Sequence, residues 1–381
     1  MSPWSLQCSA CAYAQPDGLK LASLCPDCGQ PLLARYASAV PRTAITGEAS
    51  LWRYRAALPL VAGERAVTLG EGMTPLLELP HLAAEIGVRR LWVKDEGINP
   101  TASFKARGLM MAVTRAKALG LPGVCVPTAG NAGIALAAYA AAAALPCRIF
   151  APETTPPPIL GSIRAFGAEL ELVSGHIGDA GKATMAFAKE RGFFNVATVR
   201  EPYRVEGMKT MGYEVAEQLG WRLPDAIVYP TGGGEGTIGI WKAIGEMLDW
   251  GWLPPDTRRP RMIIAQAAGC APLVRAFAAG EEKATPWEAP ATHASGLRVP
   301  GPLGDRMTLR TLRESGGDAE AVSEERIRHG TFLLASRSGI DAAPEGGCAI
   351  EATRQLVVAG RLAPESEVVV FNTGSGASYR W

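Results

Sequence analysis

The sequence lacks the features of membrane, secreted and nucleic-acid-binding proteins. No apolar run approaches the roughly 20 residues that span a bilayer. Lys and Arg number 38 against 37 Asp and Glu, so the formal net charge of +1 disfavours nucleic acid as a main partner. Residues 1–15 have neither the charged start nor the apolar core of a secretory signal. We therefore expect a cytoplasmic protein without a membrane or nucleic-acid partner.

Aromatic residues are also few, at 7% of the chain, whereas Gly is plentiful at 43 residues. The length of 381 residues allows two ordinary domains and a small appendage. Short apolar runs alternate with helical patterns from 109 to 197, which predicts a parallel, doubly wound sheet. We predict an α/β fold with two such domains. The large domain comprises 37–108 and 211–381, the small domain comprises 109–210, and residues 1–36 form a separate segment.

Cysteine is scarce outside the first 36 residues. Cys8 and Cys11 form one Cys-x-x-Cys pair, and Cys25 and Cys28 form another. Two such loops can direct four sulfur atoms to one centre, as in a tetrahedral zinc ribbon. Because a reducing cytoplasm disfavours disulfides, we predict a structural Zn²⁺ on these residues; the alternative is a ribbon-shaped fold without metal. The remaining cysteines are expected to pack in the core: Cys125, Cys147, Cys270 and Cys348.

One lysine lies at the junction between an expected strand and an expected helix. The apolar run 91–93 is followed by a turn of small and polar residues that contains Lys105, and a helical pattern begins near Leu109. In α/β proteins such junctions carry the chemistry. A lysine beside an apolar neighbour, here Phe104, can lose its proton and attack a carbonyl carbon. Lys105 is thus the predicted nucleophile, and a helix N-terminal lysine without a role is the alternative.

A glycine loop lies between another expected strand and helix. Its bare glycines expose backbone N–H groups and the helix start adds positive potential, so an anion is expected there. Gly234, Gly236 and Gly239 also satisfy a dinucleotide pattern, which requires an acid at the end of the next strand. That position holds Gln266 and Ala267. A single phosphate is therefore favoured over a dinucleotide or a purely structural turn. The loop residues are Gly232, Gly233, Gly234, Glu235, Gly236 and Thr237.

A carbonyl-reactive lysine and a phosphate loop together indicate pyridoxal 5'-phosphate, which combines an aldehyde with a phosphate. The chain resembles the fold-type II pyridoxal-phosphate enzymes, and most closely the threonine synthase family, from residue 1 to the end. Residues 99–105, Asn-Pro-Thr-Ala-Ser-Phe-Lys, are similar to the motif that binds the cofactor as a Schiff base, with Ala102 where glycine is usual. Further segments similar to that family are 70–76, 206–210 and 343–346, and a four-cysteine ribbon also occurs in it.

The resemblance implies roles for the cofactor-binding residues. Lys105 would carry the cofactor, and residues 232–237 would bind its phosphate. Asn131 would hydrogen-bond its phenolic oxygen, and Thr373, within 372–376, would place a neutral hydroxyl at the pyridine nitrogen. Such a hydroxyl leaves the ring a weaker electron sink, which steers the chemistry toward elimination and replacement at Cβ or Cγ. The preceding loop would bind the substrate carboxylate: Thr128, Ala129 and Gly130.

The implied activity is that of a homodimeric threonine synthase, which converts O-phospho-L-homoserine and water to L-threonine and phosphate. Arg204 and Lys209 are candidate partners of the substrate phosphate. Two departures keep alternatives open. The residue after the Schiff-base lysine is usually Asp in the family, but here it is Ala106, which is closer to the serine and threonine dehydratases. Glu201 stands where many threonine synthases have Asn. The alternatives are a serine/threonine dehydratase, a β-replacement enzyme similar to cysteate synthase, and a binding protein in which the ribbon is the working part.

Overall fold

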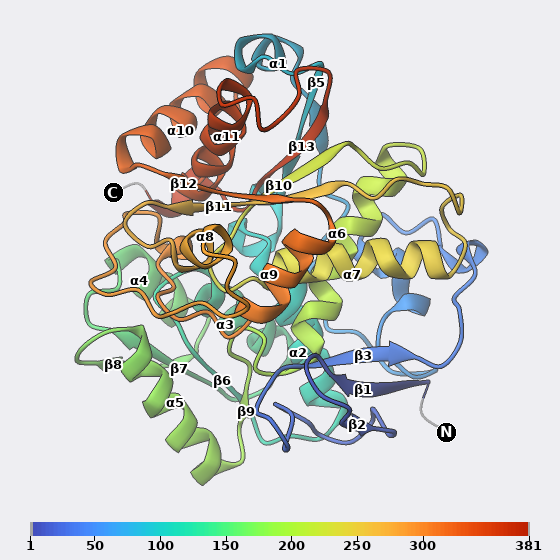
Figure 1. Ribbon diagram of the computed structural model, residues 1–381. Coiled ribbons are helices and arrows are strands. Elements are labelled where there is room, and N and C mark those ends of the chain that lie inside the picture. The colour runs from blue at the N-terminus through green and yellow to red at the C-terminus, as the bar shows by residue number, and fades with distance from the viewer. Residues whose placement is uncertain (1–2, 380–381) are drawn as a thin grey trace. The chain divides into compact units, whose positions relative to one another are not determined.

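The computed structural model describes residues 3–379 (Figure 1). Residues 1–2, which begin the predicted N-terminal segment, and residues 380–381, which end the predicted large domain, lie outside these described residues. The chain forms two compact units. Unit 1 comprises Met1–Gly72, Asn99–Thr101 and Lys105–Thr210, and unit 2 comprises Met73–Ile98, Ala102–Phe104 and Met211–Trp381.

Residues 37–72 group with unit 1, whereas the sequence-based division placed them in the large domain. Buried polar contacts within unit 1 account for this grouping. Glu71 is fully buried and accepts hydrogen bonds from Trp52 Nε1 at 2.8 Å and from the Tyr139 hydroxyl at 2.6 Å. Trp52 also packs in the hydrophobic core of that unit. A connector without strand or helix periodicity gives no sign of such partners.

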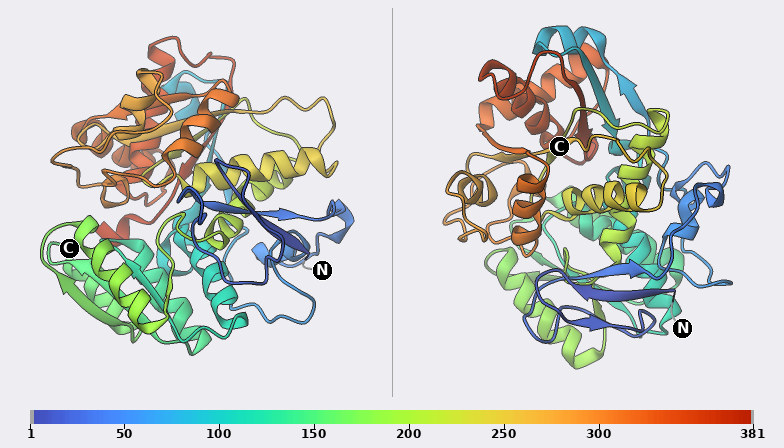
Figure 2. Two further views of the ribbon diagram at one scale, coloured as in Figure 1. Left: turned by 60° about the horizontal axis from the view of Figure 1, so that its bottom comes forward. Right: turned by 45° about the vertical axis from the view of Figure 1, so that its right-hand side comes forward.

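The N-terminal segment of unit 1 is a small antiparallel sheet with the strand order β2-β1-β3 (Figure 2). The strands are β1 (Trp4–Cys8), β2 (Ala14–Gln15) and β3 (Leu32–Tyr36). Because side chains alternate between the two faces of a strand, β1 and β3 bury every second residue. One face of this sheet is therefore apolar, and its core contains Trp4, Leu6, Leu32 and Ala34.

The remainder of unit 1 is built on a parallel sheet with the order β8-β7-β6-β9. Val124 and Val126 of β6 pack in a core with α2 and α3, whereas Cys125 between them packs in a cluster with α5 residues on the other face. A strand that is apolar on both faces is typical of a parallel sheet covered by helices. The strands are β6 (Val124–Pro127), β7 (Cys147–Pro152), β8 (Glu169–Val173) and β9 (Phe194–Asn195). The helices are α2 (Lys105–Ala118), α3 (Asn131–Ala143), α4 (Pro157–Ala165) and α5 (Ile177–Arg191).

Unit 2 contains a larger sheet with the order β12-β11-β10-β13-β5-β4, parallel except for the antiparallel edge strand β4. Figure 1 shows α1, α10 and α11 on one face of this sheet and α7, α8 and α9 on the other. The strands are β4 (Leu76–Glu78), β5 (Arg90–Asp95), β10 (Ala226–Pro230), β11 (Arg261–Ala267), β12 (Asp318–Val322) and β13 (Glu367–Asn372). The helices are α1 (Pro80–Ile86), α7 (Glu235–Asp249), α8 (Pro272–Ala278), α9 (Asp305–Glu314), α10 (Glu324–Ser338) and α11 (Pro344–Val358).

The sequence predicts a polar link over 198–210 and a helix over 211–219, whereas the observed helix α6 (Tyr203–Gln218) already begins at Tyr203. Residues 198–210 look polar and suggest a link between helices. Four of their charged side chains, however, are buried: Glu201, Arg204, Glu206 and Lys209. Polar composition therefore does not mark a loop here, because these charges are used inside unit 1.

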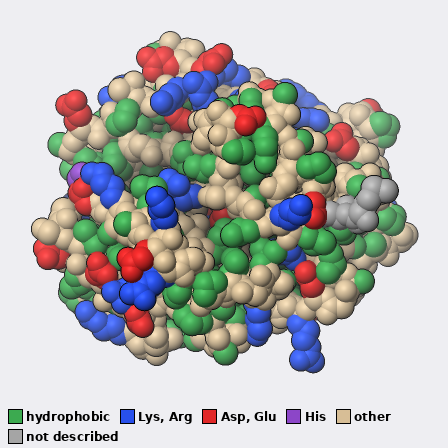
Figure 3. Space-filling model, turned by 90° about the horizontal axis from the view of Figure 1, so that it is seen from below, with side chains coloured by type: hydrophobic (Ala, Val, Ile, Leu, Met, Phe, Trp, Pro, Cys, Tyr) green, Lys and Arg blue, Asp and Glu red, His purple; other side chains and the backbone are tan. Residues whose placement is uncertain are grey.

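No helix within residues 3–379 is long and apolar enough to cross a bilayer. The face in Figure 3 carries basic and acidic side chains interspersed among apolar and uncharged ones. This mixture agrees with the nearly balanced formal charge of the chain.

Candidate active site

The glycine loop of unit 2 leads from the end of β10 into α7. Helix α7 begins at Glu235, with Gly234 as its N-cap at a φ of 90°. The first N–H groups of a helix have no acceptor within the helix, and the helix dipole adds positive potential there. This loop therefore provides backbone donors for an anion such as a phosphate.

Three glycines of this loop leave no room for a side chain. A Cβ atom added to any of them would overlap a neighbouring atom of unit 2. Only glycine permits this close packing of the loop, and the bare backbone is what a phosphate requires. The overlapping atoms, each at 2.3 Å, are the Gly296 carbonyl oxygen for Gly232, Thr308 Oγ1 for Gly234 and the Tyr229 hydroxyl for Gly236.

Gln266 occupies the place where dinucleotide binding would require an acid. Its side chain is fully buried, and Nε2 donates to the Thr231 carbonyl at 2.9 Å. Its Oε1 accepts from the backbone N–H groups of Leu273 and Val274, at 2.9 and 3.2 Å. Gln266 thus fixes the base of the glycine loop to the start of α8 and has no acceptor left for a ribose.

Thr373 follows β13 directly and is 5% exposed. Its carbonyl accepts from the Phe104 N–H at 3.1 Å, and Ser103 forms a β-bridge with Gly374. Ser103 Oγ and Asn372 Oδ1 are buried without a hydrogen-bond partner among the described residues. Such atoms call for an explanation, of which a ligand is one. Two buried polar atoms without a partner among the described residues therefore lie beside Thr373, the residue predicted to face the pyridine nitrogen.

Lys105 is the first residue of α2 in unit 1 and is half-buried. The helix begins four residues before the predicted start near Leu109, so Lys105 belongs to the helix and not to the turn. A helix N-terminus disfavours a positive charge, which suits a lysine that acts as a neutral amine. The residues before it are constrained, since Thr101 and Ala102 have φ values of 63° and 56°.

Asn131 is the first residue of α3, after Gly130 as N-cap. Its Oδ1 is buried and has no hydrogen-bond partner among the described residues. Thr128 orders the preceding loop, because its Oγ1 accepts from the N–H groups of Gly130 and Gly133 at 3.1 and 3.2 Å. An amide that the protein leaves unsatisfied fits a residue that hydrogen-bonds a cofactor.

Glu201 supports the start of α6. Its Oε2 accepts from the Tyr203 N–H at 2.7 Å, and its Oε1 accepts from the Arg204 N–H at 2.9 Å. Glu201 is 1% exposed, so this departure from the family pattern has a structural role in satisfying the helix start. Arg204 is fully buried, and its Nη1 donates to the Val196 carbonyl at 2.6 Å.

Lys209 is held by groups of unit 1. Its Nζ lies 2.7 Å from Glu206 Oε2, and neither side chain is exposed. Tyr36, the last residue of β3, donates from its hydroxyl to the same carboxylate at 2.6 Å. Its ring centroid lies 4.3 Å from Lys209 Nζ, within cation–π range. The sequence analysis identified neither Tyr36 nor the ion pair between Glu206 and Lys209. The i,i+3 spacing of Glu206 and Lys209 is a signal for the ion pair, whereas nothing in the sequence points to Tyr36.

Helices α2 and α6 cross in close contact within unit 1. A Cβ atom on Gly207 would lie 2.1 Å from the Arg107 carbonyl oxygen, and one on Gly108 would lie 2.6 Å from Met208 Cε. The buried Arg107 also donates from Nη1 to Thr210 Oγ1 at 3.0 Å. The Arg-Gly pair that follows Ala106 therefore joins the helix of Lys105 to the helix of Arg204.

The four cysteines of the N-terminal segment converge. All four Sγ atoms lie within 4.8 Å of one another. The separation is 3.4 Å between Cys8 and Cys28 and 3.6 Å between Cys11 and Cys25. None of them forms a disulfide. The predicted cysteine cluster is therefore present.

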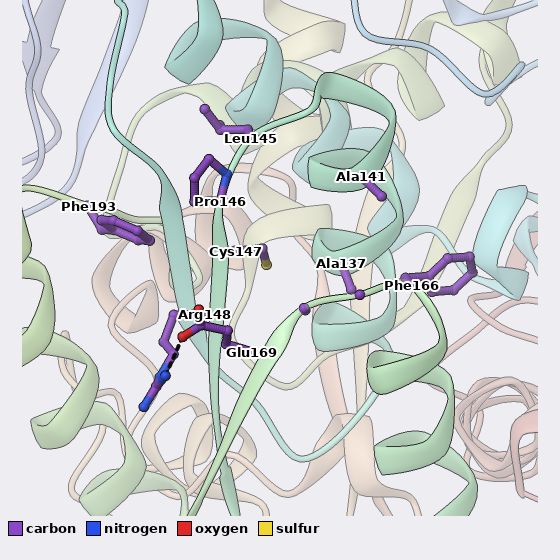
Figure 4. A pocket seen from close by; sticks show the side chains of 11 residues that line it. Ala137, Ala141, Leu145, Pro146, Cys147, Arg148, Phe166, Glu169 and Phe193 are labelled. Atoms are coloured by element: carbon purple, nitrogen blue, oxygen red, sulfur yellow. Dashed lines mark hydrogen bonds and ion pairs between the residues drawn. The ribbon is translucent and has the colours of Figure 1, made fainter.

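Figure 4 shows a separate pocket of about 160 Å³ in unit 1. It lies by the C-terminal half of α3, where Ala137 and Ala141 line it together with Cys147 of β7. An ion pair joins its Arg148 and Glu169 (Figure 4). The pocket contains none of the predicted cofactor or substrate residues.

Residues 67–374 match a protein family described as pyridoxal-phosphate dependent enzyme. This range includes Lys105, Asn131, the glycine loop and Thr373. The chain belongs to this family.

Curated relatives of the chain are threonine synthases. The one from Methanocaldococcus jannaschii is 34% identical over 332 residues, which cover 86% of this chain and 80% of that protein. The one from Methanosarcina acetivorans is 35% identical over 328 residues, covering 85% and 79%. The resemblance to the threonine synthase family is thereby confirmed.

Solved structures confirm the fold. Maize serine racemase superposes with a TM-score of 0.69 at 20% identity, over 80% of this chain and 88% of that chain. The processed form of threonine deaminase isoform 2 from Solanum lycopersicum superposes with a TM-score of 0.69 at 19% identity, over 93% and 94%. The predicted α/β architecture with parallel sheets is therefore correct.

Proposed function

We propose that the protein converts O-phospho-L-homoserine and water to L-threonine and phosphate, as a pyridoxal-phosphate-dependent lyase. The observation that carries this proposal is the 34% to 35% identity to threonine synthases over most of both chains. The site supports it, because the lysine, the amide and the glycine loop of this chemistry are all present.

Bound pyridoxal phosphate supplies an aldehyde carbon that links to amines and a ring that stabilises negative charge at Cα. Lys105 would hold the cofactor covalently, and the backbone of residues 232–237 would bind its phosphate. Asn131 would bind the phenolic oxygen through an amide that the protein leaves unsatisfied. Thr373 would offer a neutral hydroxyl to the pyridine nitrogen. Each of the two units thus offers groups that suit one part of the proposed cofactor.

The chain's own groups bind the substrate and move its proton. N–H groups of the loop Thr128, Ala129 and Gly130 would bind the carboxylate, and Lys105 Nζ would take the Cα proton. Arg204 would stabilise the phosphate as it leaves Cγ, before water adds at Cβ. Lys209 is the second candidate, but it would first have to leave Glu206 to reach a phosphate. Arg204 is likewise fully buried and donates from Nη1 to the Val196 carbonyl, so either candidate would have to give up a contact within the protein to reach a phosphate.

A substrate panel tests the proposal. We expect phosphate and threonine in equal amounts from O-phospho-L-homoserine, and a loss of about 10²- to 10⁴-fold in Lys105→Ala, because a general base is removed. Lys117→Ala, at the other end of the same helix, is the matched control and should retain the rate. Borohydride reduction and peptide mapping should place the cofactor on Lys105. Keto acid from serine or threonine without phosphate release would instead identify a dehydratase.

We also infer that the four clustered cysteines bind one structural zinc ion. With Zn–S bonds of about 2.3 Å, tetrahedral geometry separates the sulfur atoms by about 3.8 Å. The observed Sγ separations of 3.4 and 3.6 Å, and the upper bound of 4.8 Å, are compatible with such a site. We further infer a cytoplasmic homodimer, from the resemblance to the threonine synthase family.

A further inference from the structure

Glu345, in the first turn of α11, is a buried carboxylate that the proposed reaction does not use. Its Oε1 accepts two hydrogen bonds, from the Gly296 N–H at 2.7 Å and from the Tyr379 hydroxyl at 2.7 Å. Ser295 Oγ in turn donates to the Tyr379 hydroxyl at 3.3 Å. Three segments of unit 2 that are distant in sequence therefore meet at one carboxylate.

Gly296 connects this carboxylate to the phosphate loop. Its carbonyl oxygen lies 2.3 Å from the position that a Cβ atom would take on Gly232. The same residue thus donates its N–H to Glu345 and places its carbonyl directly against the loop. Because the contact is already tight, a shift of Gly296 would change the space available to the loop backbone.

The neighbouring residue connects the carboxylate to the predicted pyridine-binding segment. A Cβ atom on Gly346 would lie 2.5 Å from Asn372 Oδ1. The Ala343 N–H, at the start of α11, donates to the Gly374 carbonyl at 2.8 Å. Glu345 therefore lies between the two parts of unit 2 that are assigned to the cofactor, the glycine loop and the residues around Thr373.

We propose that Tyr379 is a positioning residue for the cofactor and acts through Glu345. By donating to Glu345, Tyr379 fixes the carboxylate that holds Gly296 against Gly232. The phosphate loop is then already shaped for its ligand before that ligand binds. The C-terminal 3₁₀ turn (Gly376–Tyr379) is thus part of the cofactor site. This inference rests on the proposed pyridoxal phosphate, and not on the identity of the amino-acid substrate.

The hydrogen bonds around Glu345 explain why a phenol is used. Burial raises the pKa of the Glu345 carboxyl, and the bonds from Tyr379 and Gly296 act in the opposite direction. Without the phenol one donor is lost and the buried carboxyl is free to reorient, because a buried acceptor seeks another partner. The hydrogen bond from the Gly296 N–H to Glu345 then weakens, although no residue that would contact the cofactor has changed.

Tyr379→Phe tests this inference, with Tyr139→Phe as the matched control. Tyr139 donates to a buried carboxylate, Glu71 Oε2, at 2.6 Å, but belongs to unit 1. Each variant is stripped of cofactor and titrated with pyridoxal phosphate, and binding is read from the visible absorbance. We expect an affinity about tenfold weaker in Tyr379→Phe, as for one hydrogen bond, and an unchanged affinity in Tyr139→Phe. A chain that ends at Ser378 should match Tyr379→Phe and replaces it if that variant does not fold.

An unchanged affinity in Tyr379→Phe, or an equal loss in both variants, would overturn the inference. A wild-type protein that binds no pyridoxal phosphate would overturn both this inference and the proposed function. Binding with the expected tenfold difference, but without phosphate release from O-phospho-L-homoserine, would support the role of Tyr379 and refute only the substrate assignment.

Discussion

Two consecutive residues shortly before Lys105, Thr101 of unit 1 and Ala102 of unit 2, have a backbone conformation that is uncommon for residues other than glycine. Thr101 and Ala102 both have left-handed φ values, 63° and 56°. A residue with a Cβ atom pays roughly 1–2 kcal/mol for this conformation, whereas glycine adopts it freely. The family motif usually has glycine where this chain has Ala102. The chain therefore carries local strain shortly before α2, the helix that begins with Lys105.

Ala102→Gly should relieve this strain. Glycine removes a penalty of roughly 1–2 kcal/mol but loses about 0.5–1 kcal/mol through the greater freedom of the unfolded chain. We expect the free energy of unfolding to rise by about 0.5–1 kcal/mol in urea titrations. Ala112→Gly, in the interior of α2, should lower it by about 1 kcal/mol. A loss of stability in Ala102→Gly would show that the left-handed backbone is not strained.

Single residues differ in how far the sequence reveals them. Lys105, Asn131 and the glycine loop stand in contiguous motifs whose chemistry can be read from neighbouring residues. Tyr36 and Glu345 do not, because each acts through partners more than 30 residues away in the chain. No local sequence pattern predicts such a hydrogen bond, because its two residues become neighbours only in the folded chain.

At the scale of elements, apolar strands were the most predictable feature. The sequence predicts strands over 124–127 and over 169–173, because turn residues border each apolar run. The observed strands β6 (Val124–Pro127) and β8 (Glu169–Val173) have the same bounds. The start of α6 was missed, since the buried charges Arg204, Glu206 and Lys209 look like those of a solvated link. Segments whose charges are paired inside the protein cannot be distinguished from loops by composition alone.

The start of α6 provides a prediction about Glu201. Glu201→Ala removes the acceptor of two helix N–H groups and should cost about 1–2 kcal/mol of stability. Glu201→Asn, the residue of many relatives in the resembled motif, can still accept and should cost clearly less. Urea titrations of both variants measure the difference. If Glu201 instead repels a phosphorylated substrate, both variants would lower KM for O-phospho-L-homoserine equally, and their stabilities would not differ.

For the whole molecule, native mass spectrometry should find two chains and two zinc ions. Cys8→Ser should lose the metal, whereas Cys147→Ser, outside the cluster, should retain it. Metal loss should also loosen β3, and with it the contact of Tyr36 to Glu206, while the pyridoxal phosphate absorbance stays largely intact. Full zinc occupancy in a variant with all four clustered cysteines changed to Ser would refute this site.

The glycine contact between α2 and α6 limits which residues the chain can accept there. Lys105 opens one of these helices and Arg204 lies in the first turn of the other. A Cβ atom on Gly207 would lie 2.1 Å from the Arg107 carbonyl oxygen, so even alanine would push apart the two helices that carry the amine and the guanidinium. A substitution at Gly207 would therefore disturb the proposed reaction without changing either functional side chain.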